Sequence, residues 1–179
     1  HSYTVSTISV DAGERYAPDP ASGTLSVSGD TSVSITYYHQ FQVTFQYTLG
    51  SSGSPTAPTV YFTKFGGSAT TTAALDTSVY DWVDAGTAVS YTNPLSDSGT
   101  ERWQTNLLIS SGKSEVDSSV DESETLNPTY YHQFDVVFQY SLSDSSTPGA
   151  PTVYYTQFGS GTSMSAAKAP ATTSQDWAD

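Results

Sequence analysis

The sequence predicts an all-β protein made of two tandem immunoglobulin-like β-sandwich domains. Three observations support this fold class: residue patterns of period two, frequent turn residues, and an internal repeat. The chain has 179 residues, enough for two domains of about 90 residues each. No window shows the 3.6-residue period of an amphipathic helix. Each half therefore offers about six to eight short strands separated by turns.

The period-two pattern is clearest between Val33 and Tyr47, where aromatic or aliphatic residues alternate with polar ones. The alternating set is Val33, Ile35, Tyr37, His39, Phe41, Val43, Phe45 and Tyr47. Successive side chains of a strand point to opposite faces, so this set predicts one buried face. The same pattern returns between Tyr130 and Tyr140, which predicts a twin strand.

Self-similarity organises the whole chain. Tyr37-Tyr38-His39-Gln40-Phe41 returns as Tyr130-Tyr131-His132-Gln133-Phe134, and Ala57-Pro58-Thr59-Val60-Tyr61 returns as Ala150-Pro151-Thr152-Val153-Tyr154. Further matches join Ser2-Tyr3-Thr4 to Ser90-Tyr91-Thr92 and Asp81-Trp82-Val83-Asp84 to Asp176-Trp177-Ala178-Asp179. These collinear matches predict two domains, residues 1–88 and 89–179. An acidic segment at residues 116–127 has no counterpart in the first repeat, and we expect it to be a surface excursion.

The repeated motifs resemble Ser/Thr-rich repeats in secreted and cell-surface proteins of archaea, including segments that follow thermopsin-type peptidase domains and repeats of S-layer-like or filament-forming proteins. The motifs that carry the resemblance are Tyr-Tyr-His-Gln-Phe-x-Val-x-Phe-x-Tyr, Pro-Thr-Val-Tyr and Asp-Trp-x-Asp. The resemblance covers residues 2–179. It implies a structural or adhesive role, and no peptidase motif accompanies it.

The composition indicates an extracellular protein. Charged residues make up only 13% of the chain, about half the usual share, while Ser and Thr account for 30 and 26 residues. Hydroxyl groups do not titrate at ordinary pH, so a surface made of them suits an acidic setting. The chain contains no Cys, so disulfide bonds are excluded.

The charge excludes two classes of partner. The net charge is −13, and five Lys and Arg residues are too few to neutralise the phosphates of a nucleic acid. The same charge opposes binding to anionic membranes. No apolar stretch approaches the roughly 20 residues of a membrane-spanning helix.

No catalytic or cofactor site is predicted, and we expect the protein not to be an enzyme. His39 and His132 recur in both repeats, yet neither has a second ligand at metal-binding spacing. We expect them to be packed, hydrogen-bonded histidines. No Gly-x-Ser-x-Gly motif marks a nucleophilic serine, although Ser, His and Asp are all present.

The charged and Trp residues kept in both repeats are candidates for an inter-repeat joint: Arg15, Trp82, Asp84, Arg102 and Trp177. The Glu14-Arg15 and Glu101-Arg102 pairs suggest ion pairs that clamp strands, with each side chain finding a partner elsewhere. The carboxylates beside the two Trp residues leave a calcium site open as an alternative to solvated turn residues.

These observations predict a structural subunit of an extracellular filament or surface layer that forms a polymeric homo-oligomer. The N-terminal segment reads as a strand that adds to the sheet edge of another copy, with Tyr3, Val5, Ile8 and Val10 as candidate subunit contacts. The chain stops at a repeat boundary, which fits a longer array or continuation by other copies. The alternative is a carbohydrate- or surface-binding adhesin module, and glycans remain open as partners.

Overall fold

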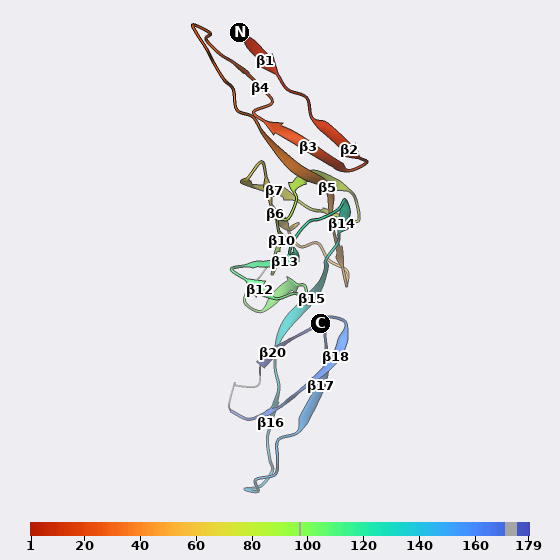
Figure 1. Cartoon of the computed structure of the whole chain (residues 1–179). Helices are drawn as coiled ribbons and strands as arrows, with labels where there is room; N and C mark the ends of the chain where they lie inside the picture. The colour runs from red at the N-terminus through yellow and green to blue at the C-terminus, as the bar shows by residue number, and fades with distance from the viewer. Residues whose placement is uncertain (97, 171–174) are drawn as a thin grey trace.

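Strands make up all the regular secondary structure of the computed structural model, which describes residues 1–96, 98–170 and 175–179. The all-β fold class is confirmed. The molecule is elongated, with N-terminal hairpins at one end and hairpins of the C-terminal repeat at the other (Figure 1). None of the described residues forms a helix that is long and apolar enough to cross a membrane.

Strand β5 (Thr36–Leu49) is the central strand. Its alternating pattern continues for 14 residues, long enough for successive segments to pair with different neighbours. Antiparallel strands β3 (Glu14–Asp19) and β9 (Val79–Asp84) pair with residues 36–41 and 40–45 of β5. Its second half pairs in parallel with β8 (Ala74–Leu75), β14 (Glu124–Leu126) and the start of β15 (Thr129–Val137).

A second, antiparallel sheet covers this one. Its strands, in spatial order, are β12 (Ile109–Ser110), β13 (Lys113–Asp117), β10 (Val89–Thr92), β6 (Thr59–Lys64) and β7 (Gly67–Thr72). The β6–β7 hairpin turns at Phe65 and Gly66, which both have positive φ, as a tight two-residue turn requires. The consecutive hairpin strands β6 and β7 are thereby held in one register.

The core lies between the two sheets. Strand β5 contributes Phe41, Val43, Phe45 and Tyr47, the second half of the set predicted to be buried. Neighbouring strands of the same sheet contribute Val83, Leu126 and Tyr130, and the second sheet and connecting segments contribute Val60, Phe62, Val89, Tyr91 and Val120. Each such side chain contributes roughly 1.5–3 kcal/mol when fully buried, so this cluster is the main source of stability.

The C-terminal repeat reproduces the strand pairing of the N-terminal one. Strands β11 (Glu101–Gln104), β15 and β20 (Gln175–Ala178) pair in the register of β3, β5 and β9. The hairpin of β17 (Thr152–Gln157) and β18 (Ser160–Ser165) matches β6–β7, and β16 (Gln139–Tyr140) with β19 (Ala167–Lys168) matches β5–β8. The internal repeat of the sequence is therefore also a repeat of strand pairing.

The N-terminal segment forms an arm of paired strands. Strand β1 (Ser2–Thr4) pairs with β4 (Ser22–Thr24), and β2 (Ile8–Asp11) pairs with β3 at the edge of the β5 sheet. The arm lies at the end of the molecule opposite β17 and β18 (Figure 1).

The structure corrects two local expectations. The long strand begins at Thr36, and Val33 before it is exposed, because no strand of the described residues pairs with that stretch. The acidic segment is not a surface excursion: Val120 and Leu126 are buried, and β14 pairs with β5. Apolar residues are interspersed with its acidic ones, so one side of the segment can face the core.

Strands from residues 89–130 belong to the sheets built on β5 and β6, so these two sheets draw on both sequence repeats. A chain ending at Val137 should therefore retain a cooperative unfolding transition, whereas a chain ending at Ala88 should lack one. Thermal melts followed by near-ultraviolet circular dichroism test this expectation. A cooperative transition in the shorter chain would instead support two separate domains, 1–88 and 89–179.

Candidate assembly interface

Strand β10 of the second repeat completes the sheet of the first repeat. It lies antiparallel to β6, with Ser90 opposite Tyr61 and Tyr91 opposite Val60. Tyr91 is fully buried, and its hydroxyl donates a hydrogen bond to the Leu126 carbonyl oxygen over 3.2 Å. Burial raises the pKa of this phenol, which keeps it a neutral donor. A strand of one repeat thus fills the edge and core of the other.

Strand β14 and the start of β15 close the other sheet in the same way. Leu126 lies opposite Phe45 and Tyr130 opposite Leu49, both in parallel pairing with β5. Tyr130 is fully buried, packs edge-on against Tyr47 with ring centroids 6.1 Å apart, and donates a hydrogen bond to the Thr92 carbonyl oxygen over 2.6 Å. Residues 89–130, which we call the donated segment, therefore pair with both sheets.

The loop after β5 fits closely against rings of the second repeat. A Cβ atom on Gly50 would lie 2.7 Å from Tyr131 Cδ1, and a Cβ atom on Gly53 would overlap the Trp103 ring. Trp103 itself is nearly fully buried and stacks on His132, with centroids 4.4 Å apart. The two glycines therefore allow a close approach that a larger residue would prevent.

The C-terminal repeat has no such complement among the described residues. Phe134 is 46% exposed, whereas its counterpart Phe41 is 8% exposed. Val136, Phe138, Tyr140, Val153 and Tyr155 are each only partly buried, although their counterparts in the first repeat belong to the core. The same apolar pattern thus stays partly open to solvent in the second repeat.

The predicted subunit contacts lie on the N-terminal arm. Tyr3 is on β1 and Val5 follows it, and both are half-buried. Ile8 and Val10 lie on β2 and are more than half exposed. These four residues are therefore accessible to a partner, although they are spread over two strands.

The predicted joint residues of the first repeat gather on one face of β3, β5 and β9. Arg15 lies over the Trp82 ring, 4.0 Å from its centroid, and donates two hydrogen bonds to Gln40 Oε1. Gln40 is fully buried and donates to Asp84 Oδ1 over 2.8 Å. Asp84 also accepts the backbone N–H groups of Phe65 and Gly66. This network ties the β6–β7 turn to the central sheet.

The second repeat contains the same network. Arg102 lies 3.8 Å from the centroid of the Trp177 ring and donates to Gln133 Oε1. Gln133 donates a hydrogen bond to Asp179 Oδ1. The other oxygen of this carboxylate accepts the Gly159 N–H. Each network thus lies inside one repeat, across three paired strands.

Sequence reasoning missed Gln40 and Gln133, although both are buried in the centre of these networks. Their signal was available: each Gln recurs at the matching position of an otherwise aromatic segment. The histidines beside them are half-buried and hydrogen-bonded, as expected. His39 Nε2 lies 2.8 Å from Glu14 Oε1, and His132 Nε2 lies 2.6 Å from Glu101 Oε1.

The carboxylates considered for calcium are engaged by protein donors. Asp81 pairs with the Lys64 ammonium group over 2.5 Å, and Asp176 accepts from Tyr155 and Gln157. The described residues contain no group of three or more His, Asp or Glu side chains placed to hold a metal ion. The observed role of these carboxylates is to link strands of one repeat.

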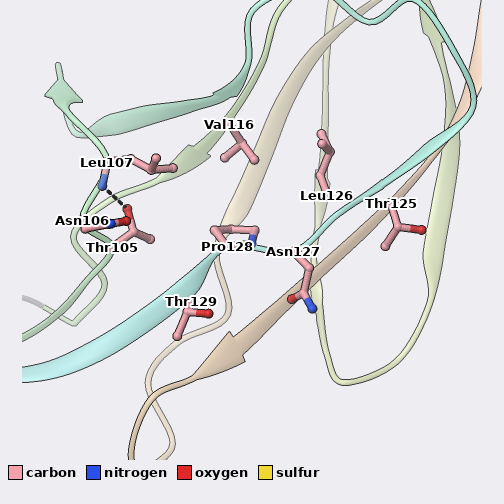
Figure 2. Close-up of a pocket in the computed structure, with 9 residues that line it drawn as sticks. All are labelled: Thr105, Asn106, Leu107, Val116, Thr125, Leu126, Asn127, Pro128 and Thr129. Carbon is pink, nitrogen blue, oxygen red and sulfur yellow. Dashed lines mark hydrogen bonds between the residues drawn. The ribbon is translucent and has the colours of Figure 1, made fainter. Parts of the chain in front are cut away.

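A cavity of about 240 Å³ lies beside the donated segment, between residues 105–107, Val116 and residues 125–129 (Figure 2). Figure 2 shows the Leu107 N–H donating to the Thr105 hydroxyl, over 3.1 Å. The lining consists of hydroxyl, amide and aliphatic groups, without an aromatic or ionisable side chain. It therefore offers neither an aromatic platform for a sugar nor an acid–base pair for catalysis.

Glu124, on β14, lies among other acids of the same segment. Burial, then a hydrogen bond with Asp117 and repulsion from Asp117, Glu122 and Asp121, raises the pKa of Glu124 to about 7. A neutral carboxyl at this position favours the pairing of β14 with β5 because it removes one charge from the acidic group.

Replacing Gly53 with Ala should destabilise the protein by about 1–3 kcal/mol, because the new methyl group must displace the buried Trp103 ring. Urea denaturation measures the free energy of unfolding. Gly29→Ala is the matched control, since a Cβ atom there meets no heavy atom within 4 Å. Equal stabilities of the two variants would contradict the close packing of this loop.

The contribution of Glu124 to the stability of the fold should fall as the pH rises from about 4.5 to about 7. In this window folded Glu124 retains a proton that the unfolded chain, with the ordinary pKa of 4.5, has released. Lower pH therefore favours the folded state through this group. Melting temperatures of the native protein and of Glu124→Gln, measured at pH 5, 6 and 7, should differ in slope, with the flatter profile in the variant. Parallel profiles would rule out this role of Glu124.

Comparison of the chain with protein-family models, with curated proteins and with solved structures finds no match. Within the chain, the two repeats differ in one main respect. The two sheets around β5 and β6 are completed by strands of residues 89–130, while the matching strands of the C-terminal repeat lack a complement among the described residues.

Proposed function

We propose that the protein is a structural subunit of an extracellular filament or surface layer, formed from immunoglobulin-like sandwiches that complete one another by sharing strands. The observation that carries this proposal is the pairing of β10 with β6 and of β14 with β5. Strands at a sheet edge expose unpaired N–H and C=O groups, which other strands can pair with. Repeats whose first strands pair with the sheets of the preceding repeat can extend as a linear assembly.

The surface chemistry supports an extracellular location. Ser and Thr dominate the composition, charged residues are few, and the chain lacks Cys. Such a surface keeps its hydrogen bonds when carboxylates gain protons, and the raised pKa of Glu124 adds stability on the acidic side. These features also agree with the resemblance to repeats of archaeal surface proteins.

The repeated polar groups support a structural role over a catalytic one. The Arg15–Gln40–Asp84 network and its copy around Gln133 join backbone and side chains of neighbouring strands. A buried network of this kind stabilises a particular arrangement of strands, since each member left without a partner costs about 1–3 kcal/mol. The residues most faithfully repeated in this chain therefore serve its architecture.

Sedimentation and negative-stain electron microscopy of the purified protein test the proposal. We expect concentration-dependent association into linear particles whose width matches one elongated molecule. A protein that stays monomeric over a hundredfold range of concentration would exclude a self-assembling subunit. Binding of that monomer to a glycan array would favour the adhesin alternative.

A further inference from the structure

We propose that residues 1–37 of one copy complete the open C-terminal sandwich of a second copy, with β1 pairing antiparallel to β17 as β10 pairs with β6. This inference rests on the proposed assembly role and specifies the partner and the register. The occupant of the open edge is thus a second copy of this chain.

The accepting edge is β17. Among the described strands it pairs with β18 alone, whereas its counterpart β6 pairs with both β7 and β10. Tyr154 on β17 is 81% exposed, while Tyr61 at the same position of β6 is half-buried. The Thr156 carbonyl oxygen accepts the Asp179 N–H, but no described strand pairs with this edge at Val153 and Tyr154, where the exposed Tyr154 ring also lacks cover.

The donating strand is already formed. Strand β1 pairs with β4 through Ser2 opposite Thr24 and Tyr3 opposite Gly23. Strand β10 pairs with β13 in the matching way, with Tyr91 opposite Ser114. Among the described strands β1 has no second partner, whereas β10 also pairs with β6. The N-terminal arm thus has the strand pairing of residues 89–130 but lacks the second sheet that pairs with them.

The internal pairing fixes the expected register. Ser90 lies opposite Tyr61 and Tyr91 opposite Val60. Transferred through the repeat, Ser2 of one copy lies opposite Tyr154 of the other, and Tyr3 lies opposite Val153. The half-buried Tyr3 ring then takes the place that Tyr91 fills when fully buried.

A second contact follows from the same transfer. Leu126 and Tyr130 lie beside Phe45 and Leu49 of β5 and are almost fully buried. Their counterparts Val33 and Tyr37 are 43% and 37% exposed. In the second copy these residues would lie beside Phe138 and Leu142, which covers apolar groups on both molecules.

The geometry favours pairing between copies over pairing within one chain. The arm with β1 and the hairpin with β17 lie at opposite ends of the elongated molecule (Figure 1). Each copy therefore presents a donor at one end and an acceptor at the other. Head-to-tail contacts of this kind extend as a filament when the rotation between copies does not close a ring.

One side chain of the internal joint is missing from the N-terminal arm. Lys113 of β13 lies over the Tyr61 ring, 3.5 Å from its centroid. Ser22 occupies the register position of Lys113, because it lies opposite Thr4 as Lys113 lies opposite Thr92. The contact between copies therefore lacks this cation–π interaction. An ammonium group introduced at Ser22 should strengthen the contact.

Cysteine pairs test the register. The chain has no Cys, so the introduced thiols are the only ones. Directly opposed residues of antiparallel strands have Cα atoms about 4.5–5.5 Å apart, within the range of a disulfide. We expect the double variant Ser2→Cys/Tyr154→Cys to form reducible covalent multimers under mild oxidation.

Two matched pairs control this experiment. Tyr61→Cys/Ser90→Cys should close within one chain and give a monomer, because these residues are opposed in the internal joint. Ser2→Cys/Thr156→Cys places the second thiol two residues further along β17 and should crosslink far less. Equal crosslinking of both Ser2 pairs, or none while the internal pair closes, would overturn the proposed register.

A gain of affinity provides an independent test. Ser22→Lys should strengthen association about 2- to 5-fold in sedimentation experiments, because it supplies an ammonium group over the Tyr154 ring. Ser26→Lys adds the same charge away from this position and should not. Tyr154→Ser should remove the gain of Ser22→Lys. Equal gains from the two lysines would attribute the effect to net charge and reject this contact.

The outcomes separate this inference from the proposed function. Assembly without the Ser2–Tyr154 crosslink would retain a self-assembling subunit and reject β1–β17 pairing. Absence of any assembly would reject both. Multimers linked through Ser2 and Tyr154, together with the gain from Ser22→Lys, would support both.

Discussion

The structure depends on the need to pair the edges of its sheets. Strands β5 and β6 expose backbone donors and acceptors on the sides where their own repeat supplies no neighbour, and residues 89–130 of the next repeat pair with them. Each unpaired and buried polar group would cost as much as a lost hydrogen bond. The same strands bring Tyr91, Leu126 and Tyr130 into the core, so one event satisfies the edge and covers the apolar face. The sheets around β5 and β6 consequently combine strands of both sequence repeats.

Local patterns predicted the longest strands. The alternation between Val33 and Tyr47 reflects side-chain directions that every strand shares, so it identified β5 to within three residues of its start. The repeat of motifs likewise predicted twin strands, and the β17–β18 hairpin has the register of the β6–β7 hairpin. The turn at Phe65–Gly66 recurs at Phe158–Gly159 with positive φ in both copies. These features depend on residues close in sequence.

The partner of each strand could not be predicted in this way. Phe41 and Phe134 occur in almost the same sequence context, yet one is buried and the other is half exposed. This difference in burial accompanies the strands of residues 89–130, which pair with the sheets of the first repeat. The residue pattern within a single strand carries no information about such partners. The Arg15 and Trp82 contact was equally hidden, because it joins residues on β3 and β9 that meet only through β5. Pairing information of this kind is a property of the assembled sheet.

The two joints of an assembly built in the proposed way would differ in strength. Inside the chain, Gly50 and Gly53 admit the Tyr131 and Trp103 rings, and the Lys113 ammonium group covers Tyr61. At the joint between copies Ser143 and Ser146 stand where the two glycines do, and Ser22 stands in place of Lys113. A Cβ atom at the position of Gly50 would meet a ring at 2.7 Å, so the loop of the accepting copy must adopt another path. Close approach and cation–π contact thus favour the internal joint. The two repeats would then remain one stable unit while contacts between copies form and separate with concentration, which is the order of strengths that a polymerising subunit requires.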